Sequence, residues 1–152
     1  MHNIPSPYGN DLADFDLVCE SRNTHNRDLL KSVRPKVSSQ YERYVTSSRL
    51  AGAPEAESFS GEVRKLLFSN FSKMDTGKAC EHLRMEVFTR TQDGQCPYCS
   101  LQDASSLDHI IERSTHPEFA VLRLNLAPVC ERCNREKENA RAKCDRNHRF
   151  HL

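Results

Sequence analysis

Apolar side chains recur at helical spacing in the first half of the chain. The clearest stripe has five members, at successive offsets of 4, 3, 1 and 4 positions: Phe59, Val63, Leu66, Leu67 and Phe71. This spacing is typical of an amphipathic helix that buries one face. The pattern therefore predicts a helix over residues 55–74, ended by Thr76-Gly77.

Weaker patterns predict further helices on either side of this stripe. Residues 11–33 follow the helical period only in part, and Arg34-Pro35 predicts a break after them. Residues 40–50 and residues 79–88 each place apolar side chains on one face, which predicts two short helices. We therefore expect the N-terminal region to be mostly helical.

The pattern changes near residue 90, where cysteines and histidines begin to cluster. Residues 92–95 predict a turn, and the apolar run 107–111 is typical of a strand. These changes predict an α+β fold with a helical N-terminal region, residues 1–90, followed by a smaller module, residues 91–152.

Composition limits how much of the stability can come from an apolar core. The 152 residues are 37% hydrophobic and 28% charged, mean hydropathy is -0.72, and there is no tryptophan. Such a chain buries a modest core, so part of its stability is expected from another source. Residues 1–10 lack the features of a signal peptide, and no stretch has the length of a membrane span. We expect a cytoplasmic protein with no membrane partner, in which cysteines bind metal rather than form disulfides.

Charge is balanced overall but unevenly distributed. Lys and Arg number 22 against 21 Asp and Glu, which gives a formal net charge of +1. Residues 1–20 carry four acidic side chains and no Lys or Arg, whereas residues 130–152 carry seven basic and four acidic side chains. The basic C-terminal end is consistent with a polyanionic partner, although the charge pattern taken alone is explained more simply by a solvated helix face.

Four of the seven cysteines form two closely spaced pairs. Cys96 and Cys99 make one CxxC pair, and Cys130 and Cys133 make another, with 30 residues between the pairs. Two residues between thiolates let the chain turn tightly around a zinc ion, with Zn–S distances of about 2.3 Å. Four thiolates leave no open position for substrate, so the sequence predicts a structural zinc site. Of the other three cysteines, we expect only Cys80 to lie in the core, and we assign no role to the other two.

The order of motifs around these cysteines resembles that of the HNH nucleases, the ββα-metal type. CPYC, LDHI, HPEF, NLAPVC and CNREK follow one another between residues 94 and 140. His109 matches the first histidine of the family name and Asn125 the middle asparagine, while Asn134 at the last position makes this an HNN variant. The resemblance implies a zinc-stabilised ββα-metal module for the C-terminal part.

The residues at these positions suit phosphodiester hydrolysis, which needs an activated water and neutralisation of charge on the phosphate. Histidine is the side chain best suited to act as a general base near neutral pH, which favours His109. Asp108 and Asn134 offer hard oxygen ligands, which suit Mg²⁺ or Mn²⁺ better than zinc. The resemblance implies that Asp108 and Asn134 hold the catalytic metal, that His109 is the base, and that Asn125 braces the loop that orients it.

Two basic residues follow Asn134 on the same helical face, Lys137 at i+3 and Arg141 at i+7. We expect both to contact substrate phosphate, against the simpler alternative that they are only exposed. Arg113 stands where the family often has proline, which affects the shape of the loop, and His116 is expected to be an exposed loop residue.

One geometric difficulty follows from the strand itself. Consecutive strand residues point to opposite faces, so Asp108 and His109 cannot both face one site from a regular strand. The resemblance implies that a twisted hairpin and its loop bring the two together.

Together these features predict a metal-dependent DNA endonuclease, and the resemblance implies that it leaves 5′-phosphate and 3′-hydroxyl ends. The alternative is a non-catalytic zinc-binding module that recognises nucleic acid or protein. Small HNH proteins with a helical leader also resemble the nuclease subunit beside an ATPase in Septu-like anti-phage systems, which makes an ATPase a possible partner of the N-terminal region. A restriction-type or phage packaging nuclease is equally open.

Overall fold

The computed structural model describes residues 8–49 and 52–148, which divide into two compact units. The first unit consists of residues 1–85 and 109–126, and the second of residues 86–108 and 127–152. The units therefore interleave along the chain, whereas composition predicts one boundary near residue 90. The observed division differs from the predicted boundary because residues 109–126, between the two cysteine pairs, pack with the N-terminal helices.

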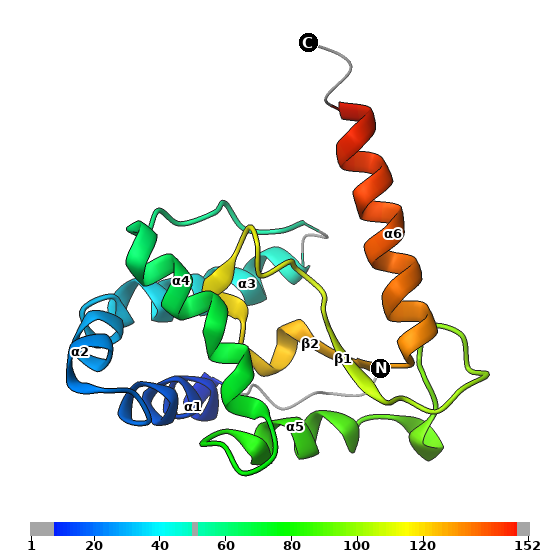
Figure 1. Cartoon of the computed structure of the whole chain (residues 1–152), viewed down its shortest axis with the longest axis horizontal. Helices are drawn as coiled ribbons and strands as arrows, with labels where there is room; N and C mark the ends of the chain where they lie inside the picture. The colour runs from blue at the N-terminus through cyan, green and yellow to red at the C-terminus, as the bar shows by residue number, and fades with distance from the viewer. Residues whose placement is uncertain (1–7, 50–51, 149–152) are drawn as a thin grey trace. The chain divides into compact units, whose positions relative to one another are not determined.

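Four helices and a short 3₁₀ segment form the first part of this unit (Figure 1). Their bounds are α1 Tyr8–Glu20, α2 Thr24–Ser32, α3 Arg34–Arg49, α4 Gly61–Ser69 and η1 Asn70–Met74. The predicted helix over residues 11–33 is thus two helices, because the Asn23 side chain caps α2 by accepting a hydrogen bond from the Asn26 N–H at 2.9 Å. The break predicted at Arg34-Pro35 separates α2 from α3, and Pro35 lies in the first turn of α3, where its missing N–H costs nothing.

Helix α4 is shorter than the apolar stripe predicts. It begins at Gly61 rather than near residue 55, because the Ser60 hydroxyl caps it and accepts a hydrogen bond from the Val63 N–H. Val63 and Leu67 are buried as the stripe requires. The predicted face is therefore correct, but residues 55–59 of the predicted helix have no regular secondary structure.

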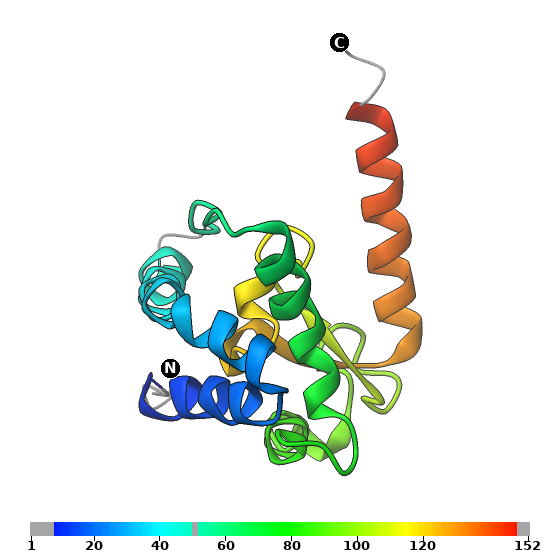
Figure 2. The ribbon, with the colours of Figure 1, turned by 60° about the vertical axis from the view of Figure 1, so that its left-hand side comes forward.

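Phe119 lies at the centre of the first unit's apolar core, although it comes from the segment between the cysteine pairs. It belongs to the 3₁₀ helix η3 (Pro117–Phe119), which lies beside α3 and α4 (Figure 2). Its ring meets Tyr44 edge-on at 5.1 Å between centroids and stacks on His116 at 5.3 Å. His116 is therefore buried, not exposed as expected, and its Nε2 donates to the Pro54 carbonyl at 2.9 Å.

The acidic start of the chain is paired inside the first unit. Asp14 is buried, and its two carboxylate oxygens each lie 2.7 Å from a basic nitrogen, one on Arg123 and one on His82. Asp16 accepts two hydrogen bonds from Arg34 at 2.7 and 2.8 Å nearer the surface. The local excess of negative charge seen in the sequence therefore has cations within its own unit.

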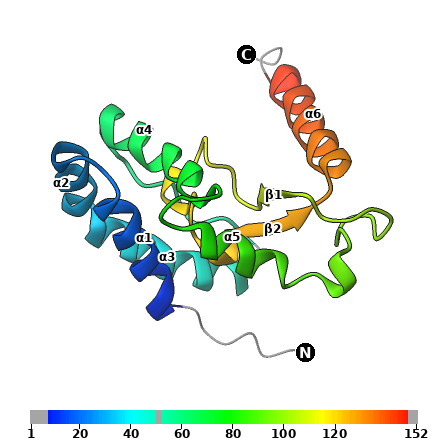
Figure 3. The same cartoon turned by 60° about the horizontal axis from the view of Figure 1, so that its bottom comes forward.

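The second unit contains a strand pair followed by a long helix. Strands β1 (Ser106–His109) and β2 (Leu126–Val129) pair antiparallel, and α6 (Glu131–His148) follows β2 directly (Figure 3). The other elements of the described residues are η2 (Gln92–Gly94) in the second unit, η4 (Arg123–Asn125) in the first, and α5 (Glu81–Phe88), whose residues divide between the two units. The α+β class and the β–β–α order are confirmed.

Two sequence expectations about single features can also be compared with the described residues. Cys80 is fully buried, as expected. Among the described helices, none combines the length and the apolar character needed to cross a membrane.

Breaking the buried pair should cost far more than breaking the exposed one. Arg123→Met leaves the Asp14 carboxylate buried without its guanidinium, and we expect the free energy of unfolding to fall by about 3 kcal/mol. Arg34→Met is the matched control, since that ion pair is about 40% exposed on both sides, and it should cost less than about 1 kcal/mol. Urea unfolding of both variants measures the difference, and equal losses would contradict the account.

A second buried carboxyl should make stability depend on pH. Neither carboxylate oxygen of Glu118 has a hydrogen-bond partner in the described structure, and burial raises the pKa of this group from 4.5 to about 7. Between these two pH values the folded chain holds a proton that the unfolded chain releases, so stability falls as pH rises across the interval.

We expect Glu118→Gln to remove that fall. At pH 8 the variant should exceed the wild type in free energy of unfolding by on the order of 2 kcal/mol, and at pH 4.5 the two should agree closely. Thermal and urea unfolding at both pH values test this, with the exposed Glu42→Gln as control. A variant that is no more stable at pH 8 than the wild type would refute the role of Glu118.

Candidate functional site

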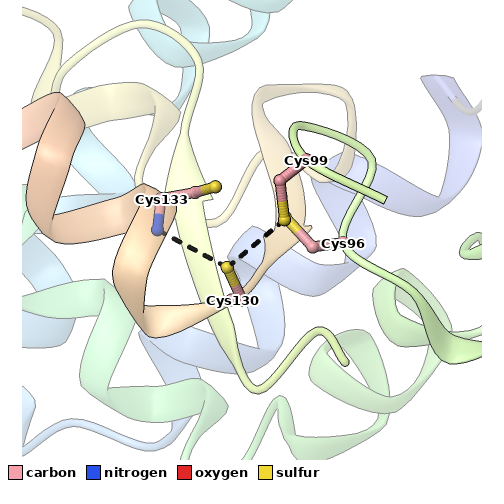
Figure 4. A group of neighbouring side chains, drawn as sticks. All are labelled: Cys96, Cys99, Cys130 and Cys133. Carbon is pink, nitrogen blue, oxygen red and sulfur yellow. Dashed lines mark hydrogen bonds between the residues drawn. The ribbon is translucent and has the colours of Figure 1, made fainter. Parts of the chain in front are cut away.

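Four cysteine side chains converge in the second unit (Figure 4). The sulfurs of Cys96, Cys99, Cys130 and Cys133 all lie within 4.8 Å of one another, and those of Cys99 and Cys130 are 3.9 Å apart. Tetrahedral thiolates around zinc stand about 3.8 Å apart, given a Zn–S length of about 2.3 Å. The four predicted ligands therefore come together at a spacing that fits a zinc ion.

Both pairs sit on tight backbone turns. In the first, the Cys96 N–H donates to the Gln102 carbonyl and the Ser100 N–H donates to the Cys96 carbonyl, both at 2.8 Å. Ser100 adopts a left-handed backbone with φ 53° to complete this turn. The second pair spans the start of α6, where the Asn134 N–H donates to the Cys130 carbonyl at 3.1 Å. The chain thus presents two sulfurs from a loop and two from a helix start.

The thiols influence one another's ionisation in opposite directions. Burial opposes ionisation of Cys96, but hydrogen bonds from backbone N–H groups, including those of Cys99 and Tyr98, outweigh it and lower its pKa to about 6. Hydrogen bonding to Cys130 raises the pKa of Cys133 to about 12. Four adjacent thiolates therefore need a cation among them, which is the electrostatic requirement that zinc satisfies.

Asp108 is buried near the end of β1 and forms contacts within the second unit. The Tyr98 hydroxyl donates to its Oδ2 at 2.9 Å, and the Lys137 ammonium forms an ion pair with the same oxygen. Tyr98 belongs to the CPYC motif, so the zinc turn also holds the carboxylate. The sequence reasoning missed this tyrosine, although its place between two ligand cysteines was a usable signal.

Asn134 and Arg141 are both on α6. The Asn134 amide nitrogen lies 3.5 Å from the Ser106 hydroxyl, on the same strand as Asp108. Arg141 is in the helix, but its side chain is outside the described residues. Asp108 and Asn134 thus both lie in the second unit, and their roles as ligands of a catalytic metal stay predictions.

His109 follows Asp108 but contacts different groups, as alternation along a strand requires. Its Nε2 lies 3.1 Å from the Ala120 carbonyl oxygen, and its ring meets Phe71 edge-on at 4.7 Å between centroids. A carbonyl oxygen can only accept, so Nε2 carries the hydrogen and, in the neutral ring, the lone pair is at Nδ1. This is the tautomer that a general base at Nδ1 needs.

Asn125 is fully buried and ties together the two segments that flank His109. Its Oδ1 accepts from the Ile111 N–H at 2.7 Å, and its Nδ2 donates to the carbonyls of Ile111 at 3.0 Å and Phe119 at 3.3 Å. Ile111 lies two residues after His109, and Phe119 precedes the carbonyl that His109 contacts. The amide therefore fixes both sides of the histidine.

The apolar stripe predicts a core position for Phe71, but it does not predict the contact of Phe71 with His109. The spacing of the stripe could not reveal this, because the partner is 38 positions away and belongs to another element. Ala120 was missed because its contribution is a backbone carbonyl, which carries no side-chain signal.

Comparison with known proteins found one family whose model matches the segment that contains these residues. Residues 96–140 match the family described as HNH endonuclease. Searches of curated proteins and of solved structures found no match to the chain. The matched segment includes all four clustered cysteines and every residue that the motif order singled out up to residue 140. Residues 96–140, less than half of the chain, are therefore similar to the HNH endonuclease family.

Proposed function

We propose that this protein is a metal-dependent endonuclease that hydrolyses DNA phosphodiester bonds. The observation that carries the proposal is the hydrogen bond between His109 and the Ala120 carbonyl, which places the lone pair of the neutral ring on Nδ1. In the proposed step Nδ1 takes a proton from water as the water oxygen bonds to phosphorus. The bond between phosphorus and the 3′ oxygen breaks, and that oxygen takes a proton from a second water molecule, which leaves 5′-phosphate and 3′-hydroxyl ends.

The donor atoms in the second unit fit a hard divalent cation. Asp108 offers a carboxylate and Asn134 an amide oxygen, a pair that suits Mg²⁺ or Mn²⁺. When bound, such an ion neutralises charge on the phosphate and on the departing oxygen. The Tyr98 hydroxyl and the Lys137 ammonium hold the Asp108 carboxylate in position, which supports its assignment.

Lys137 and Arg141 are proposed to bind the substrate phosphates. The ion pair between Lys137 and Asp108 brings its ammonium next to a proposed metal ligand, which supports a role in binding phosphate. Arg141 is one helical turn further along α6, where a phosphate further along the backbone is expected.

The four cysteines are proposed to hold one structural zinc ion. The small apolar cluster in which they lie contains only Val129 and Ala127 besides the cysteines themselves, among the described residues. Metal binding energy then takes the place of apolar burial in this unit.

A role in anti-phage defence, with an ATPase subunit bound by the N-terminal helices, is a further proposal supported by the sequence resemblance alone. Co-expression with the product of a neighbouring gene and recovery of a stable complex would test it. A lone, monodisperse and fully active protein would count against it.

Substitution of the base tests the nuclease proposal. With Mg²⁺ or Mn²⁺, we expect the wild type to cut plasmid DNA and His109→Ala to cut it at least about 100-fold more slowly, because the proton acceptor is lost. His25→Ala is the matched control, since that imidazole is on the surface in a pair with Glu62. Metal-dependent cutting that survives in His109→Ala would sink the assignment, and a folded wild type that never cuts would favour the non-catalytic module.

Removal of a cysteine ligand tests the zinc site separately. The purified wild type should contain about one zinc ion per chain, and Cys130→Ser should lose it together with thermal stability, because three thiolates bind zinc more weakly. Cys80→Ala is the control, since this buried thiol lies outside the cluster. Elemental analysis and thermal unfolding measure both quantities. A wild type without zinc and with unchanged melting after chelation would contradict the site.

A further inference from the structure

A basic and aromatic pocket on the first unit has no part in the function proposed so far. It has a volume of about 300 Å³ and is lined by Arg64, Lys65 and Phe68 from α4 and by Arg113 from the loop after β1. Three of the four lining side chains are cations, and the fourth is an aromatic ring that is 42% exposed. Arg113 is the residue at which the sequence departs from the proline common in the family.

Planar groups connect this pocket to His109. The Arg113 guanidinium carbon lies 4.2 Å from the ring centre of Phe68 and 4.7 Å from that of Phe71. Phe71 in turn contacts His109 at 4.7 Å between ring centroids. The pocket is therefore two contacts away from the proposed base, and all four residues belong to one compact unit.

The pocket is held in place by backbone contacts. Arg113 donates a hydrogen bond to the Phe68 carbonyl at 3.1 Å, and Arg64 donates one to the Ser114 carbonyl. These two bonds tie the loop after β1 to α4. Burial lowers the pKa of Arg113, yet a guanidinium stays charged at neutral pH. The site is thus an ordered cationic platform rather than a set of mobile surface charges.

We propose that this pocket binds one unpaired nucleotide of the substrate, with its base against Phe68 and its phosphates against Lys65 and Arg64. An aromatic ring beside a guanidinium is the arrangement on which bases of single strands stack. The inference rests on the proposed nuclease function, because the link through Phe71 places the nucleotide near the bond that His109 would cleave.

Two other ligands fit the pocket less well. Intact duplex DNA presents phosphates to lysine and arginine, but its bases are stacked inside the helix. No base is therefore available to stack on the exposed Phe68. An acidic peptide would satisfy the cations, but its carboxylates offer no aromatic base to stack on the ring. The pairing of aromatic surface with positive charge therefore favours an unpaired nucleotide, as found at a nick, a flap or a single-stranded region.

Binding measured without cleavage tests the proposal. The full chain, without added Mg²⁺ or Mn²⁺, is titrated into fluorescently labelled single-stranded DNA and into the corresponding duplex, and anisotropy is recorded. We expect Phe68→Leu to weaken single-strand binding about tenfold and duplex binding less than twofold, because leucine keeps the apolar volume but not the ring. Phe68→Tyr keeps the ring and should stay within about twofold of the wild type.

A variant that removes one charge and a control substitution outside the pocket complete the experiment. The slope of log K against log salt for single-strand binding is negative, and Lys65→Gln should make it less negative by about 0.7. This is the change expected for the loss of one phosphate contact. Leu17→Ala, at an exposed apolar position on α1, should change neither affinity. Circular dichroism and thermal melting confirm that each variant is folded.

Each outcome decides between the proposals. Unchanged single-strand affinity in Phe68→Leu, or equal losses for single strand and duplex, would overturn the nucleotide pocket while cleavage by the wild type leaves the nuclease proposal standing. Conversely, Phe68-dependent single-strand binding by a wild type that never cleaves would overturn the nuclease proposal and keep the pocket. Polyglutamate that binds as tightly as the oligonucleotide, with the same dependence on Phe68, would assign the pocket to an acidic peptide instead.

Discussion

The arrangement around His109 depends on the burial of one aromatic side chain, Phe119. Its ring fills the core between the tyrosines of α3 and the apolar face of α4, and burial of an aromatic side chain is worth several kcal/mol. Because Phe119 cannot move without opening that core, the next carbonyl, that of Ala120, is fixed. That carbonyl fixes the imidazole. The helical leader is therefore the scaffold of the histidine rather than an appendage.

The two units solve the problem of a polar composition in different ways. The first buries a core of ordinary size around Phe15, Leu67 and Phe119, and it neutralises its acidic side chains internally. In the second unit, the apolar cluster around the four sulfurs adds only Val129 and Ala127 among the described residues. The proposed zinc ion would supply stability there that apolar burial does not.

Sequence patterns foresaw the features that are local. The CxxC pairs, the strand at Leu107 and the helix after Cys130 follow from spacing within a few residues, and each is found. The contacts of His109 with Phe71 and with a backbone carbonyl join distant segments, and no periodicity encodes them. The prediction that His116 is exposed was wrong because its burial also depends on contacts with distant segments. The sequence near a loop histidine does not show whether a core lies behind it.

The interleaving of the two units limits how the segment similar to HNH endonucleases can be separated from the rest of the chain. Residues 109–126 are inserted between the two cysteine pairs, yet their apolar side chains pack on helices that precede residue 85. A fragment cut at the family boundary would keep every thiolate but expose Phe119 and Leu122 to water. Substitutions in α3 or α4 would therefore alter the surface on which the loop behind the histidine rests.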